Sequence, residues 1–331
     1  MYYIRSQNII ELRMYGIFMD NVNNAKNTGK FQDFLNSSAI ICRSSAATSE
    51  AVINELVELA STNTPGLNCQ DVKESVFARE AMFPTVIAPG LAMPHARVDG
   101  LENLVVALAT VEKSVRFGSE DDGEDVKVVV LVLSPADNPG LHLHVVSALA
   151  REFSDLSKIE QVAELQSVAE VVEFFGVVQV RLPDYLKVGD LASGIGPVLQ
   201  ADDSLEFAFR KFGESRAEQI PVLDNEGSLL GVVMLKNILS YNLPLELLEG
   251  DDLSALYDLK PYAEVIRRAA DIKVADVMTS DFETVCEDLP AAKLIKIFLQ
   301  TPRRELLVVD AEKRLRGEVR LRDFCGKIFW E

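Results

Sequence analysis

Apolar residues follow two different spacings in the first half of the chain. Between Thr48 and Ser61 they recur every three to four positions, which predicts an amphipathic helix with Thr48 or Ser49 as its cap. Runs of Val and Leu at Leu104–Thr110 and Val126–Leu133 are typical of strands covered on both faces. Further helical patterns occupy Val72–Glu80, Leu141–Phe153 and Val168–Phe175. The first half is therefore expected to fold as an α/β domain.

The second half consists of two similar copies. Lys187-Val-Gly-Asp190 recurs 86 residues later as Lys273-Val-Ala-Asp276, and Asp224 falls on Asp310 in the same frame. Each copy predicts a strand, a helix, a strand, a turn, a strand and a helix, with the aspartates starting the turns. We expect an ill-packed extension over residues 1–30, followed by an α/β domain over residues 31–176. The first repeat then covers residues 185–243, an acidic linker residues 244–271, and the second repeat residues 272–330.

This repeat resembles the paired CBS module, from about Tyr185 to Phe329. The likeness rests on the β-α-β-β-α order, the apolar-apolar-Asp entry to each turn, and the Gly-x-Val-x-Leu-basic-Asn/Asp ending of each copy. The resemblance implies that the copies stack with pseudo-two-fold symmetry and form a homodimer. It also implies that an adenine nucleotide (AMP, ADP or ATP) binds in the clefts between them.

The ending of each copy supplies the candidate nucleotide contacts. Where the usual ending reads Gly-apolar-x-Ser/Thr-x-x-Asp, Met234 and Arg320 replace the hydroxyl residue, and Asn237 replaces one aspartate. By the resemblance, Asp323 would accept hydrogen bonds from the ribose and Arg320 would meet a phosphate, with Asn237 at the equivalent place in the first copy. The alternative is that Asn237 and Asp323 cap the last helix of each copy.

Composition and charge restrict the classes of partner. The 331 residues include 33 Lys and Arg against 51 Asp and Glu, a net charge of −18. Such a surface repels nucleic-acid phosphates and anionic lipid, so a basic protein is the expected kind of partner. No apolar run approaches the ~18 residues of a membrane span, so no membrane insertion is expected. The four cysteines form no C-x-x-C pair, which is typical of a cytoplasmic protein.

All three histidines fall in the first domain, two of them within longer motifs. His95 lies in Gly90-Leu-Ala-Met-Pro-His-Ala-Arg97, and His142 opens His142-Leu-His-Val-Val. Arg79-Glu80 and Thr85 precede the first motif. Together these motifs resemble the enzyme IIA domain of the bacterial sugar phosphotransferase system, of the mannitol/fructose and nitrogen-regulatory type.

The enzyme IIA resemblance covers about Phe31–Phe175 and implies a mixed-sheet α/β fold with flanking helices. It implies that His95 carries a phosphoryl group received from an HPr-like phosphocarrier, with His142, Arg79 and Arg97 in the active site. The chemistry agrees, because a neutral imidazole is a good nucleophile near pH 7 and phosphoryl transfer needs cationic groups around its oxygens. The loop before the motif departs from the family, since Val86, Ala88 and Pro89 stand where glycines are common.

Other chemistries have less support. His142 and His144 are two residues apart and do not face one another on a helix, so no metal site is expected and His144 is taken as a solvated residue. The leading hypothesis is a regulatory phosphoryl carrier, since no enzyme IIB or membrane IIC segment follows. The alternative is a non-catalytic nucleotide-sensing CBS protein whose enzyme IIA-like domain is a docking module, with a transporter or a kinase as the candidate regulated protein.

Overall fold

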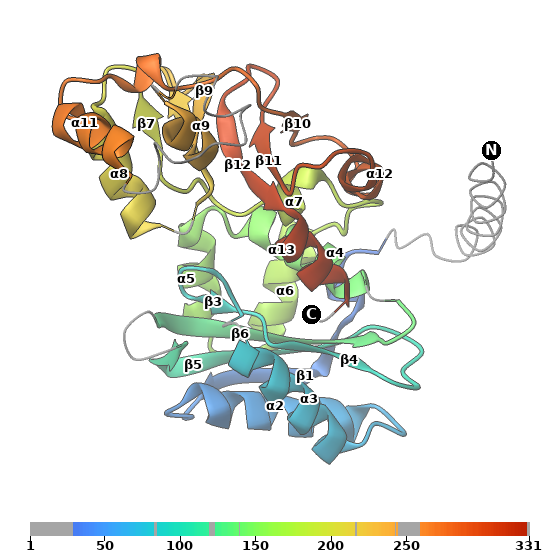
Figure 1. Ribbon diagram of the computed structural model, residues 1–331. Helices are drawn as coiled ribbons and strands as arrows, with labels where there is room; N and C mark the ends of the chain where they lie inside the picture. Colours follow the sequence, from blue (N-terminus) through green and yellow to red (C-terminus); the bar gives the residue numbers. More distant parts are fainter. Residues whose placement is uncertain are drawn as a thin grey trace, which may run out of the picture. The chain divides into compact units, whose positions relative to one another are not determined.

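The computed structural model describes residues 29–82, 85–118, 123–138, 140–215, 217–241, 243 and 259–329. Most of the expected extension and of the acidic linker therefore lies outside the described residues. The chain divides into two compact units (Figure 1). One unit spans Met1–Leu186 and includes Ile328–Glu331, and the other spans Lys187–Lys327.

The first unit contains a six-stranded mixed sheet in the order β1-β5-β6-β3-β2, with β4 paired to β6. Its strands are β1 (Leu35–Ser44), β2 (Val86–Ala88), β3 (Leu91–Ala92), β4 (His95–Val98), β5 (Val105–Phe117) and β6 (Glu124–Pro135). The long central pair β5–β6 is antiparallel, whereas β1 runs parallel to β5, and β3 and β4 run parallel to β6.

Helices cover both faces of this sheet, as the apolar runs predict. The helices are α2 (Ser49–Asn63), α3 (Cys69–Met82), α4 (Leu141–Glu152), α5 (Leu156–Glu164) and α6 (Val168–Val178), after a short 3-10 turn η1 (Phe31–Asp33). Successive residues of β6 point to opposite faces: Val130 and Val132 join the core under α4–α6, while Leu131 and Leu133 join the core under α2 and α3. Thr48 is the cap of α2, because its side chain accepts a hydrogen bond from the backbone N–H of Ala51 at 3.1 Å.

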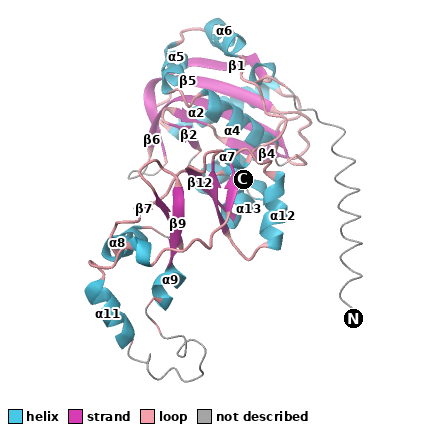
Figure 2. Cartoon of the chain, turned by 90° about the horizontal axis from the view of Figure 1, so that it is seen from above, coloured by secondary structure: helices cyan, strands magenta, loops and turns pink. Residues whose placement is uncertain are grey.

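The second unit contains two three-stranded sheets with the same topology, in which a parallel strand precedes an antiparallel hairpin. The strands are β7 (Leu199–Gln200), β8 (Gln219–Leu223) and β9 (Leu229–Met234), then β10 (Thr284–Cys286), β11 (Glu305–Val309) and β12 (Leu315–Arg320). Helical segments are α7 (Val188–Leu191), α8 (Leu205–Glu214), α9 (Leu235–Ser240), α11 (Lys260–Arg268), η3 (Val274–Asp276), α12 (Ala292–Gln300) and α13 (Leu321–Phe329) (Figure 2). The fold class expected from the sequence, a mixed-sheet domain followed by two β-α-β-β-α repeats, is confirmed.

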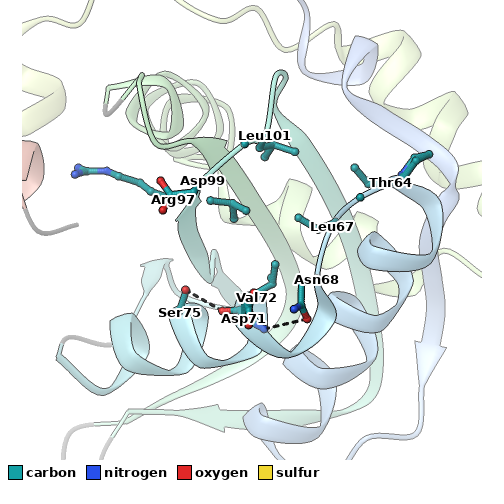
Figure 3. Close-up of a pocket in the computed structure, with 13 residues that line it drawn as sticks. Thr64, Leu67, Asn68, Asp71, Val72, Ser75, Arg97, Asp99 and Leu101 are labelled. Carbon is teal, nitrogen blue, oxygen red and sulfur yellow. Dashed lines mark hydrogen bonds between the residues drawn. The ribbon is translucent and has the colours of Figure 1, made fainter.

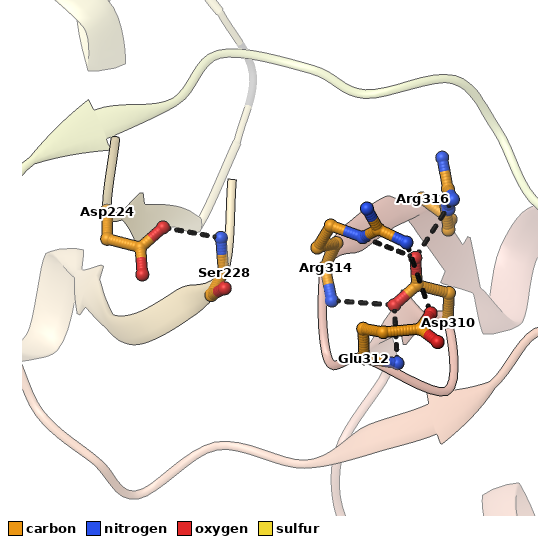
Figure 4. A network of polar contacts seen from close by, with 6 residues as sticks. All are labelled: Asp224, Ser228, Asp310, Glu312, Arg314 and Arg316. Atoms are coloured by element: carbon orange, nitrogen blue, oxygen red, sulfur yellow. Dashed lines mark hydrogen bonds and ion pairs between the residues drawn. The ribbon is translucent and has the colours of Figure 1, made fainter. Parts of the chain in front are cut away.

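Equivalent residues of the two repeats make reciprocal contacts. Lys187 Nζ lies 2.5 Å from Asp288 Oδ1, and its counterpart Lys273 Nζ lies 2.6 Å from Asp202 Oδ1. The aspartates that open the hairpin turns also act alike, since Asp224 accepts the backbone N–H of Ser228 and Asp310 that of Arg314 (Figure 4). The repeats therefore associate about a pseudo-two-fold axis, as the resemblance to the CBS module implies.

Candidate active site

His95 is the first residue of strand β4 and pairs with Val132 of β6. Its side chain is buried, and its Nδ1 lies 2.9 Å from the carbonyl oxygen of Met93. Because a carbonyl oxygen can only accept, Nδ1 must carry the proton. In the neutral ring this leaves the lone pair on Nε2, which is the nitrogen available as a nucleophile.

His142 is brought against His95 from a different element. It is the second residue of α4 and is only 1% exposed. The two imidazole rings stack, with their centroids 4.9 Å apart and their planes 18° from parallel. The structure thus brings together the two histidines that the sequence places in one site, although 46 residues separate them.

The two expected arginines lie on elements that pack against each other. Arg79 is buried in the last turn of α3, and α3 packs against β4, the strand of both His95 and Arg97. Since side chains alternate along a strand, His95 and Arg97 share one face. Arg97 also borders an open cavity of about 460 Å³ between the α2–α3 loop and the end of β4, and its guanidinium extends away from Asp71 and Asn68 (Figure 3).

Sequence reasoning attached no role to Ser134. This residue pairs with Arg97 in the β4–β6 register, is fully buried, and its hydroxyl has no hydrogen-bond partner within the described part of the chain. The sequence feature that could have indicated Ser134 is its position directly after the Val/Leu run of the strand, where it is the first hydroxyl residue.

The departures in the preceding loop have a structural reason. Val86 and Ala88 belong to β2, which pairs with β3 through a turn at Pro89 and Gly90. Gly90 has a φ of +88°, the conformation that the third residue of a type II turn needs, and proline suits the position before it. This segment is therefore a tight hairpin that leads into the strand of His95.

The expectation that His144 is solvated is wrong. Its ring is half-buried, and its Nδ1 lies 2.7 Å from the carbonyl oxygen of Pro183. Within the described residues no cluster of His, Cys, Asp and Glu side chains is suited to holding a metal ion. None of the described helices is long and apolar enough to span a membrane.

Arg320, the candidate phosphate contact of the second unit, faces acidic side chains. Its guanidinium pairs with Glu318, and its Nε lies 3.8 Å from Glu305 Oε2. Burial, together with the neighbouring Glu318, raises the pKa of Glu305 to about 7. The cleft beside Arg320 has a volume of about 10 Å³, room for about one water molecule. In this structure the positive charge of Arg320 is therefore directed to carboxylates.

The other two candidate contacts lie within the last helix of each repeat. Asn237 lies inside α9, whose cap residue is Met234, and Asp323 lies in the first turn of α13. The alternative that these two residues cap the helices is therefore wrong, because each lies past the helix start. An acidic side chain in the first turn still interacts favourably with the helix dipole, which accounts for Asp323.

Comparison with known proteins identifies both halves. The family model described as "Phosphoenolpyruvate-dependent sugar phosphotransferase system, EIIA 2" matches residues 33–176, and that of the CBS domain matches residues 188–243 and 274–329. The PTS system fructose-specific EIIA component of Haloferax volcanii is 30% identical over 135 residues, which are 38% of this chain and 86% of that protein.

Longer relatives and solved structures are also similar. The PTS system 2-O-alpha-mannosyl-D-glycerate-specific EIIABC component of Escherichia coli is 27% identical over 42% of this chain, but the chain spans only 23% of that protein's length. The crystal structure of nitrogen regulatory protein IIA-Ntr from Neisseria meningitidis is 29% identical, covers 44% of this chain and 97% of its own, and has a TM-score of 0.40. That of CBSX2 in complex with AMP is 23% identical over 42% of this chain and 92% of its own, with a TM-score of 0.32.

The matched ranges coincide with the mixed-sheet unit and with the two small sheets described above. The chain belongs to the enzyme IIA type 2 family of the phosphotransferase system, and it joins this phosphoryl-carrier domain to a pair of CBS domains.

Proposed function

We propose that this protein is a regulatory phosphoryl carrier whose acceptor atom is Nε2 of His95. The observation that carries the proposal is the state of that ring: Met93 holds Nδ1 in its protonated form, and His142 stacks on the ring. An HPr-like phosphocarrier with a phosphohistidine is the donor. The lone pair of Nε2 forms the new P–N bond, and the P–N bond of the donor breaks with its electron pair returning to the donor imidazole.

Arg79 and Arg97 neutralise the phosphoryl oxygens during this transfer. In phosphoryl transfer the protein mainly positions the reactants and stabilises charge on the equatorial oxygens, and arginine offers several donors in a planar fork. His142, at the amino-terminal turn of α4, holds the His95 ring in place by stacking. The acidic remainder of the chain suits a basic donor surface.

The CBS pair gives the carrier its regulatory role through self-association. Helix α12 exposes Ile295 and Leu299, which are 38% and 80% exposed and four residues apart, so they lie on one helix face. Large exposed apolar side chains in such a row favour an interface between two copies of the chain. Adenine-nucleotide sensing is the second possible role of the pair, and the acidic surroundings of Arg320 disfavour it at that cleft.

The carrier role is tested by intact mass. The protein is incubated with phosphoenolpyruvate, enzyme I and HPr, beside His95→Ala and a His144→Gln control that removes a different histidine. We expect a gain of one phosphoryl group in the wild type and the control, and no gain in His95→Ala. No gain in the wild type would contradict the carrier role and favour the docking-module alternative.

The oligomeric role is tested by light scattering on Leu299→Glu. We expect a dimer that this substitution converts to a monomer while phosphoryl uptake is kept. A wild-type monomer would contradict the proposed interface.

A further inference from the structure

A series of hydrogen bonds connects helix α3 to the ring of His95. Glu80, in the last turn of α3, accepts the hydroxyl of Thr85 at 2.5 Å and its backbone N–H at 3.3 Å. The carbonyl of Thr85 accepts the backbone N–H of Met93 at 2.8 Å. The carbonyl of Met93 in turn accepts Nδ1–H of His95. Each link fixes the orientation of the next acceptor.

The Glu80 carboxylate is partly buried, and hydrogen bonds from Thr85 favour its charged form. Burial raises the pKa of Glu80, and the two hydrogen bonds from Thr85 act against that increase because they favour the charged form. Thr85 is itself only 4% exposed, so its hydroxyl would be left unsatisfied without this acceptor.

We propose that Glu80 is a positioning residue for phosphoryl transfer, which acts through Thr85 and Met93 to hold His95 with its proton on Nδ1. The inference rests on the proposed acceptor role of His95. If the carbonyl of Met93 turned away, Nδ1–H would lose its partner and the Nε2–H tautomer would become populated. A protonated Nε2 has no lone pair with which to attack phosphorus, so the transfer rate would fall.

The experiment compares Glu80→Ala and Thr85→Val with Glu74→Ala, an exposed carboxylate on the same helix. Two quantities are measured on the full chain: the initial rate of phosphoryl uptake from phosphorylated HPr, and the ¹⁵N shifts of the His95 ring, which report the tautomer. We expect Glu80→Ala and Thr85→Val to lower the rate about 10- to 100-fold, since small misplacement of a reacting group has effects of this size. We expect them to mix the tautomers, whereas Glu74→Ala changes neither quantity.

Glu80→Gln separates positioning from folding, because its amide oxygen can still accept the Thr85 hydroxyl. It should restore most of the rate and the wild-type shifts. The proposal is overturned if folded Glu80→Ala keeps both the rate and the tautomer, or if the rate falls while the tautomer stays unchanged. If even the wild type takes up no phosphate, the carrier role fails, and the ¹⁵N shifts still decide whether Glu80 positions the ring.

A separate contact connects the active-site helix to the segment that leads into the second unit. His144, two residues after His142 on α4, contacts the carbonyl of Pro183, and the second unit begins at Lys187. The same segment is anchored beside it: Val180 and Leu182 are 3% and 5% exposed. Its backbone also bonds to the amino-terminal residues Gly29 and Phe31.

We infer that His144 transmits the phosphorylation state of His95 to the segment before the CBS pair; this inference also rests on the proposed acceptor role. A phosphoryl group adds about −1.5 to −2 charges. It would arrive beside His142, in the first turn of α4, and a displacement of α4 would act directly on the His144–Pro183 hydrogen bond.

Hydrogen exchange of residues 179–186 tests this inference, with and without phosphorylation, in the wild type, His144→Ala and His144→Gln. Without phosphate, we expect His144→Ala to speed exchange about fivefold, which corresponds to the loss of one hydrogen bond, and His144→Gln to restore protection. Phosphorylation should change exchange in the wild type but not in His144→Ala, at equal gains in mass. The inference about His144 is overturned if phosphorylation changes hydrogen exchange equally in the wild type and in His144→Ala, or if a fully phosphorylated wild type shows no change. If the wild type gains no mass, the carrier role itself is refuted.

Discussion

Each of the two units has an arginine, Arg97 or Arg320, that its sequence motif predicts to contact a phosphate group. The surroundings of these two arginines differ. Arg97 shares a strand face with His95, and the ring of His95 stacks on that of His142. Arg320 also ends a strand, yet it faces Glu305 and Glu318. Because two carboxylates already accept the charge of Arg320, we expect this arginine to contribute less to phosphate binding than its motif position suggests.

The largest expected effect separates these two arginines directly. Arg97→Met should lower the rate of phosphoryl uptake about 100-fold, because removing one preorganised donor to a developing charge has an effect of that order. Arg320→Met should leave the rate unchanged. Both rates are measured by mass spectrometry on samples quenched at successive times after mixing with phosphorylated HPr. Equal rates for Arg97→Met and Arg320→Met would show that the two arginines do not differ in phosphoryl transfer.

A smaller effect concerns the acidic pair that faces Arg320. The pKa of Glu305 is raised to about 7 by burial and by Glu318, so its stabilising contribution is complete below its ordinary value of 4.5 and is lost as the pH rises through 7. Lowering the pH from 8 to 5.5 should therefore stabilise the second unit by about 2 kcal/mol. Urea unfolding of the full chain at both pH values checks this expectation.

Glu305→Gln provides the control for the pH effect. The amide cannot ionise and can still pair with Gln219, which contacts Glu305 in the wild type at 3.2 Å. The variant should lose this part of the pH dependence and leave phosphoryl uptake unchanged. A variant with the full wild-type pH dependence would show that another group is responsible.

The smallest expected effects test whether the units are stabilised separately. Thr48 caps α2 in the first unit, and Ser204 caps α8 in the second by accepting the backbone N–H of Phe207. Thr48→Ala and Ser204→Ala should each cost about 1 kcal/mol of folding free energy. Hydrogen exchange should show reduced protection only in the unit that carries the substitution. Reduced protection in both units would argue against separate stabilisation of the units.

The long elements of the fold could be predicted from the sequence by their period, whereas short ones could be predicted only where a motif or the repeat marks them. The helix capped by Thr48 and the paired runs of β5 and β6 have enough residues to display a period. Strand β4 has only four residues, so no period reveals that His95 begins a strand. The motif still located the histidine, because its identification depends on residue order and not on secondary structure.

Contacts between distant residues account for the rest of the differences. The acidic partners of Arg320 include Glu305, from the adjacent antiparallel strand, and the register that joins them depends on the folded hairpin. Helix spacing alone predicts a solvated His144, because it does not show that Pro183 returns to α4. In the same way, the sequence gives Thr85 and Glu80 as neighbours of the motif but does not show that Met93 connects them to the His95 ring.

The proposed carrier role is tested most directly by identifying the nitrogen that carries the phosphoryl group. Protein labelled with ¹⁵N in its histidines is phosphorylated through HPr, and the ³¹P–¹⁵N coupling is assigned with His95→Ala and His142→Ala. We predict a single phosphohistidine with phosphorus bonded to Nε2 of His95. Phosphorus on Nδ1 of His95, or on His142, would contradict it.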